Sequence, residues 1–122
     1  MKRNIDLIRQ ILLYCEDKNP DRVYTDELAD ELDVDFETIS YHIQLLDDCG
    51  YIQTDAMHAI GSFMPDFIIY RITSYGHDYL DSVRDDDVYK ETKKKLGPKF
   101  ASITLDVVKS VATEVIKGQL GI

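Results

Sequence analysis

Residues 25–50 read TDELADELDVDFETISYHIQLLDDCG, and this stretch decides the fold. Apolar side chains recur at three- and four-residue spacing in two runs, 28–32 and 36–46, which is the pattern of helices with one buried face. Thr25 and Asp35 precede the two runs and are residue types that cap helices. Two short helices joined by a tight turn predict a helix–turn–helix unit.

The flanking sequence extends this unit on both sides. We expect a helix before it at about residues 5–17, two strands after it at 51–54 and 67–72, and a further helix at 74–84. This order predicts a winged helix–turn–helix domain over residues 1–85, mainly α with a small β-hairpin, in which the hairpin loop is the wing. Residues 86–122 then form a C-terminal helical extension that packs or dimerises.

Length and composition indicate a globular chain in the cytoplasm. The chain has 122 residues, of which 44% are hydrophobic, enough for one small domain with an extension. No apolar run reaches the ~18 residues of a membrane span, and the N-terminus lacks the apolar core of a signal peptide. Cys15 and Cys49 are therefore expected to be buried free thiols rather than a disulfide or part of a zinc site.

The charge of the helix–turn–helix stretch conflicts with its shape. The whole chain carries a formal net charge of −9. Between Arg22 and Gly50, Arg22 is the only base, and the acids are Asp26, Glu27, Asp30, Glu31, Asp33, Asp35, Glu37, Asp47 and Asp48. A nucleic-acid-binding domain usually shows a basic surface, whereas this stretch repels a polyanion.

DNA binding by a dimer is the function that the predicted fold favours. In such a fold the exposed face of the second helix enters the major groove. The side chains expected there as base contacts, next to Glu37 and His42, are Thr38, Ser40, Tyr41 and Gln44. Phosphate contacts would come from Arg3, Arg9 and Arg71. The partner would be a DNA operator, and the activity transcription regulation.

Protein binding is the alternative that the charge favours. An acidic helix–turn–helix would occupy a basic surface on another protein. The wing carries no Lys or Arg but contains the apolar residues Met57, Ile60, Phe63 and Met64. We expect these side chains either to tuck against the core or to form a protein-binding tip.

The last helix, expected at about residues 104–119, has an unusually wide apolar stripe. Its centre is formed by Val107, Val111 and Val115, and Val108, Ala112 and Ile116 widen it. A stripe of this width needs a partner surface. The partner is either the helix at 5–17 or the same helix of a second subunit, and we expect a homodimer.

Catalytic and metal-binding patterns are absent from the sequence. There is no phosphate-cradling glycine loop, no nucleophile elbow and no His-Glu-x-x-His zinc motif. His42, His58 and His77 are scattered along the chain. We therefore expect no enzymatic activity, no cofactor and no metal ion, and interpret Lys93-Lys94-Lys95 as the complement to a helix dipole.

The chain resembles a family of short bacterial and phage proteins of unknown function. Three segments carry the resemblance: Met1 to Arg9; Ile39 to Leu46 followed by Gly50-Tyr51-Ile52; and Arg71-Ile72-Thr73 with Gly76 to Leu80 and Arg84-Asp85-Asp86. The resemblance implies a winged-helix fold and a frequent phage or prophage origin. It implies no activity, so the phage-type regulator remains a hypothesis based on the predicted architecture.

Overall fold

The computed structural model describes residues 1–57 and 63–122, which form two compact units, Met1–His77 and Asp78–Ile122. The division falls inside helix α4 (Ser74–Val83), whereas the sequence suggested a boundary after residue 85. The protein is mainly helical with one small antiparallel sheet. The first unit contains, before the start of α4, α1 (Ile5–Lys18), β1 (Val23–Tyr24), α2 (Thr25–Leu32), α3 (Phe36–Asp48), β2 (Ile52–Met57) and β3 (Asp66–Ile72).

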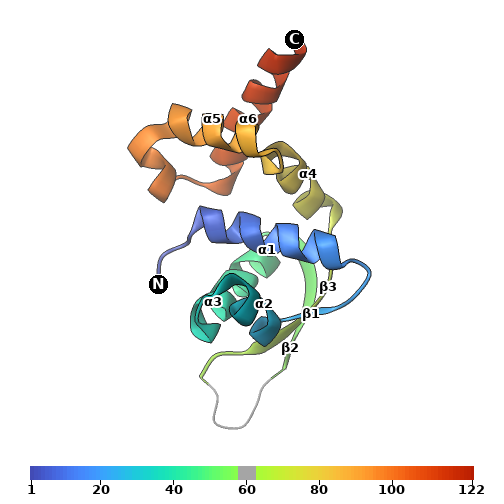
Figure 1. The fold of residues 1–122 in the computed structure, drawn as a ribbon. Coiled ribbons are helices and arrows are strands. Elements are labelled where there is room, and N and C mark those ends of the chain that lie inside the picture. The colour runs from blue at the N-terminus through green and yellow to red at the C-terminus, as the bar shows by residue number, and fades with distance from the viewer. Residues whose placement is uncertain (58–62) are drawn as a thin grey trace. The chain divides into compact units, whose positions relative to one another are not determined.

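Helix α1 forms where the apolar spacing predicted it. The side chain of Asn4 accepts a hydrogen bond from the backbone N–H of Leu7 and so caps the helix. Its buried side chains are Ile5, Leu7, Ile8, Ile11, Leu12 and Cys15. Figure 1 shows α1 lying across α2 and α3, so this apolar face covers these two helices.

Helices α2 and α3 are joined by a short turn in which Asp33 has a left-handed backbone, with φ of 53°. Helix α3 begins at Phe36, and the Asp35 side chain accepts from the backbone N–H of Thr38, as a cap should. The prediction that Thr25 caps α2 was wrong. Thr25 is fully buried inside the first turn, because its hydroxyl accepts the backbone N–H of Phe67 at 2.8 Å.

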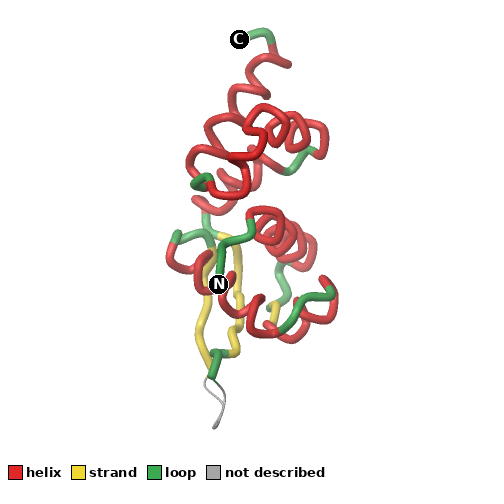
Figure 2. The backbone as a smooth tube through the Cα atoms, turned by 90° about the vertical axis from the view of Figure 1, so that its left-hand side faces the viewer, coloured by secondary structure: helices red, strands yellow, loops and turns green. Residues whose placement is uncertain are grey.

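The sheet has three strands in the order β1–β3–β2, one more than the predicted hairpin. The short strand β1 pairs with β3 through Val23 and Ile69, and Ile52 of β2 pairs with Ile72. Strand β2 continues to Met57, past the predicted end at residue 54, so the connecting loop is shorter than expected. The β2–β3 hairpin extends away from α1 (Figures 1 and 2).

The second unit contains the later part of α4, α5 (Asp86–Leu96), the 3-10 helix η1 (Gly97–Ser102) and α6 (Leu105–Leu120). In α4, Tyr79, Leu80 and Val83 are fully buried. The buried residues of α6 face α5 and are Leu105, Val108, Ala112 and Val115. The sequence did not predict η1. No helix in the described part of the chain is both long and apolar enough to span a bilayer.

Candidate functional site

The exposed surface of α2, the turn and α3 is uniformly acidic. Eight carboxylates of this stretch are exposed to solvent, and together we call them the acidic face: Asp26, Asp30, Glu31, Asp33, Asp35, Glu37, Asp47 and Asp48. From Val23 to Tyr70 the sequence contains no Lys or Arg, a span that covers both helices and the hairpin. The nearest preceding base, Arg22, lies over the ring of Tyr70, 5.0 Å from its centroid.

Three of the predicted base-contact residues lie on the outer side of α3. Gln44 is exposed and donates from its amide to the Asp48 carboxylate at 3.1 Å. Tyr41 is half-buried. The Thr38 hydroxyl donates a hydrogen bond to the Asp35 carboxylate, and the Thr38 backbone N–H donates another. These two bonds, the side-chain bond more than the backbone bond, hold the pKa of Asp35 below its ordinary value. The polar groups here are therefore already engaged with acids.

Two residues expected on the exposed face of α3 are buried instead. Ser40 is fully buried, and its hydroxyl donates to the backbone carbonyl of Pro65 at 2.7 Å. His42 is only 1% exposed. Both expectations of exposure were wrong, because these polar side chains find partners outside α3 and so can face the interior. Ser40 therefore links α3 to the residue before β3, and its buried hydroxyl cannot form a hydrogen bond with a DNA base.

His42 links α3 to the N-terminal segment through both ring nitrogens. Nδ1 lies 2.8 Å from the carbonyl oxygen of Thr38, and Nε2 lies 2.8 Å from the backbone N–H of Asn4. A carbonyl can only accept and an N–H can only donate, so the ring is neutral with its proton on Nδ1. Burial, with a smaller contribution from the nearby Arg3, lowers the pKa of His42.

The three arginines expected to hold phosphates do not converge. Arg3 lies beside Asn4, at the end of α1 that contacts α3 through His42. Arg71 is exposed on β3 and donates to the Gln53 amide oxygen at 2.8 Å. Its neighbour Ile72 lines a small pocket with Cys15 and Asn19, at the opposite end of α1. A helix of 14 residues is about 21 Å long, so Arg3 and Arg71 lie far apart. Arg9 is half-buried on α1 between them.

The apolar residues of the wing are exposed to different degrees. Phe63 is fully exposed and Met57 is 38% exposed, while Met64 is half-buried. Ile60 lies outside the described residues. Of the two alternatives expected for the wing residues, packing against the core therefore does not apply to Phe63 and Met57, and the protein-binding tip stays a prediction. An exposed aromatic ring beside a flexible thioether is a combination suited to protein contacts.

The three valines of the last helix point in different directions. Val115 is buried and packs within the second unit. Val111 is half-buried, and Val107 is 38% exposed. The predicted stripe is thus divided between a face that packs on α5 and a second, exposed side.

The two cysteines lie in different environments. Cys15 is buried, and burial, followed by the nearby Glu27, raises the pKa of its thiol to about 12. Cys49 forms no disulfide and is exposed, so the expectation that it is buried was wrong, because α3 ends at Asp48 and leaves it in the following turn.

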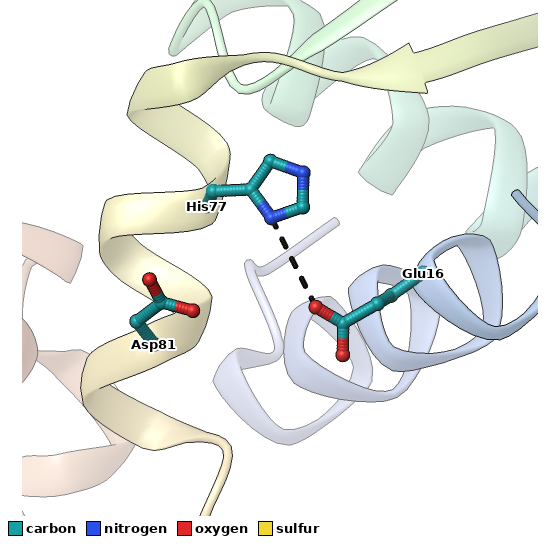
Figure 3. Close-up of side chains that lie close together, drawn as sticks. All are labelled: Glu16, His77 and Asp81. Atoms are coloured by element: carbon teal, nitrogen blue, oxygen red, sulfur yellow. Dashed lines mark ion pairs between the residues drawn. The ribbon is translucent and has the colours of Figure 1, made fainter.

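A histidine–carboxylate pair that the sequence did not indicate lies close to Cys15. Nδ1 of His77 lies 3.9 Å from a carboxylate oxygen of Glu16, with α4 and α1 placing the two side chains (Figure 3). The two residues are far apart in the sequence, so no local spacing could reveal them. Both side chains are partly exposed to solvent, and such ion pairs contribute little to stability.

Comparison with known proteins gives a family but no activity. The family described as "Hypothetical protein (DUF2513)" matches residues 2–101 of the chain. A protein from Haemophilus influenzae named "Uncharacterized protein" is 36% identical over 122 residues, which cover 98% of this chain and 99% of that relative. No solved structure matches the chain.

Proposed function

The chain belongs to the DUF2513 family, and we propose that it is a non-enzymatic winged-helix module whose acidic face binds a basic protein surface. The order α1–β1–α2–α3–β2–β3 and the sheet order β1–β3–β2 support the winged-helix assignment. In this assignment α3 occupies the place of the recognition helix, and the β2–β3 hairpin is the wing.

The single observation that carries the proposal is the acidic face itself. Its eight exposed carboxylates stand on α2, α3 and their junction, and no base stands between Val23 and Tyr70 to neutralise them. Affinity for duplex DNA comes largely from phosphate contacts by Lys and Arg. Here α3 would bring carboxylates toward the phosphates, and repulsion between like charges opposes that complex.

The chemistry of the surface indicates the partner. Glu37, Asp47 and Asp48 offer exposed carboxylates along α3, and an Arg guanidinium can bind a carboxylate through two parallel hydrogen bonds. Gln44 and Tyr41 supply polar and aromatic contacts between them. A protein that itself handles nucleic acid has a basic surface of this kind. We therefore infer a basic host or phage protein as the partner.

DNA binding by a phage- or prophage-type regulator is the competing hypothesis. It rests on the placement of Tyr41 and Gln44 on the outer side of α3, where base contacts are made in this fold. It requires Arg3, Arg9 and Arg71 to provide phosphate contacts together. Because Arg3 and Arg71 lie near opposite ends of α1, one DNA backbone segment meets at most one of these two arginines.

The test compares two charge-reversed variants that carry the same net charge. Asp47→Lys with Asp48→Lys alters the acidic face, and Asp17→Lys with Asp21→Lys alters exposed acids outside it. Each purified protein is immobilised and exposed to lysate of a bacterial host, and the captured proteins are identified. We expect wild type and the Asp17/Asp21 variant to retain the same basic protein and the Asp47/Asp48 variant to lose it.

A second measurement addresses DNA directly. Fluorescence anisotropy follows binding of each variant to random duplex DNA at low salt, where non-specific binders associate at roughly tens of micromolar. We expect wild type not to bind. Binding by wild type with a steep salt dependence, together with capture that is insensitive to Asp47 and Asp48, would support the regulator hypothesis instead.

A further inference from the structure

We propose that the exposed side of α6 pairs with α6 of a second copy of the chain in an antiparallel arrangement. This surface lies on the second unit and does not involve the acidic face, so the inference stands independently of the function proposed above. It rests on four features of α6: an exposed valine, a glycine with open space beside it, the placement of two charges and an adjacent groove.

The first feature is an apolar side of α6 that the second unit leaves uncovered. Leu105, Val108, Ala112 and Val115 are buried toward α5. Val107 is 38% exposed and Val111 is half-buried one turn further along. Residues four apart lie above one another on a helix, so these two valines form one short apolar strip.

The second feature is Gly118, which lies on the same side of α6 beyond the exposed carboxylate of Glu114. Gly118 is eleven residues after Val107, or about three turns, and so lies on the same side of the helix. A Cβ atom built on Gly118 would meet nothing within 4 Å. Glycine inside a helix is unfavourable relative to alanine, and a common reason for it is the close approach of another backbone. The described residues provide no such backbone at Gly118.

The third feature is the placement of two opposite charges. It indicates that the surface binds α6 of a second copy and that the two helices run antiparallel. Asp106 and Lys117 are also eleven residues apart and flank the same strip. An antiparallel pair centred near residue 112 places Asp106 of each copy beside Lys117 of the other, and Val107 beside Gly118. A parallel pair would instead bring both Asp106 side chains to the same end of the pair and both Lys117 side chains to the other end, which is less favourable.

The fourth feature is an open groove beside the strip, between α5 and α6. Glu114, Val115, Gly118 and Gln119 of α6 line it on one side, and Asp87, Glu91 and Lys95 of α5 line it on the other. Within the chain, Nζ of Lys117 lies 3.8 Å from a carboxylate oxygen of Glu114. Both side chains are exposed, so this ion pair is weak and a second copy can replace it.

The test is the mass of the full-length protein in solution, measured by sedimentation velocity up to roughly 100 μM, together with its melting temperature. We expect wild type to dimerise. Asp106→Lys and Lys117→Asp should each shift the protein toward monomer, and the double variant should restore the dimer. Lys99→Asp, an exposed position on η1 with the same charge change, should remain dimeric.

Gly118→Leu separates association from folding. Leucine favours a helix and meets open space in a single copy, so the melting temperature of the second unit should not fall. In the pair it blocks the close approach, so the dimer should be lost. A wild-type monomer at all concentrations would show that the strip is covered within the chain and would overturn the proposal. A dimer that survives Gly118→Leu and both single reversals would also overturn it.

Discussion

The backbone N–H of Asn4 donates a 2.8 Å hydrogen bond to Nε2 of His42, which joins the start of α1 to the middle of α3. Because the other ring nitrogen faces the Thr38 carbonyl, both partners require the neutral ring. A proton on Nε2 would place two donors against each other in a buried position. The contact between the N-terminal segment and α3 therefore depends on the protonation state of His42.

We predict that the native state loses stability as the pH falls below about 6.5, the ordinary pKa of histidine. Burial lowers the pKa of His42 in the folded protein. The stabilising effect is therefore complete above the unfolded pKa and declines as the pH falls, because the unfolded chain takes up the proton first. The urea concentration at the midpoint of unfolding, measured at pH values from about 7.5 to 5.5, reports this effect. Most carboxylates stay ionised in that range and so contribute little to the change.

Two glutamine variants identify the residue responsible. His42→Gln should lower stability at neutral pH but flatten the dependence on pH, because the titrating group is gone. His77→Gln removes the exposed histidine near Glu16 and should leave the dependence as in wild type. An equal pH dependence in wild type and His42→Gln would contradict the prediction.

Thr25→Val should destabilise the first unit by about 1–3 kcal/mol. The Thr25 hydroxyl accepts the N–H of Phe67, and both residues are buried. Valine has the same shape but leaves that N–H without a partner. Urea unfolding gives the difference in free energy, and Ser110→Ala, at an exposed position on α6, is the control. A change in Thr25→Val no larger than in the control would show that the N–H finds another acceptor.

The fold was predictable where a local pattern fixes the structure. The apolar spacing of α1, the Asp35 cap and the start of α3 at Phe36 all follow from neighbouring residues. The acidic face was predictable too, because charged side chains remain in solvent whatever the tertiary arrangement. These features need only helix periodicity and capping chemistry.

Features that depend on distant partners could not be predicted. Ser40 is buried because Pro65 supplies a carbonyl, and His42 because Asn4 supplies an N–H. A polar residue looks exposed in the sequence until such partners are known. The separation of Arg3 from Arg71 likewise follows from the way α1 crosses the domain. The sequence therefore indicated the charge of the candidate surface but not which side chains it presents.

Gly76→Ala should strongly destabilise the first unit, because a Cβ atom on Gly76 would collide with the backbone carbonyl of Tyr51 and the side chain of Ile72. Overpacking against a backbone atom typically costs about 1–3 kcal/mol or more. Gly118→Ala, measured at a protein concentration too low for dimers, is the matched control, because in a single copy its Cβ meets open space and alanine favours the helix. Thermal unfolding measures both, and equal melting temperatures would show that α4 can shift away from Tyr51.

Replacing Asp47 and Asp48 with lysine should stabilise the fold while removing binding to a basic partner. Both acids stand in the last turn of α3, where the helix dipole favours positive charge, and that turn contains no base. Each reversal should raise the free energy of unfolding by about 0.3–1 kcal/mol. The loss of the exposed hydrogen bond from Gln44 to Asp48 reduces this gain. Glu37→Lys reverses a charge in the first turn, where an acid is favourable, so it should lower stability by a similar amount. Urea unfolding of the three proteins gives the order Asp47/Asp48 variant, wild type, Glu37 variant. If the Asp47/Asp48 variant is the least stable, the two acids serve folding, and their presence no longer points to a partner.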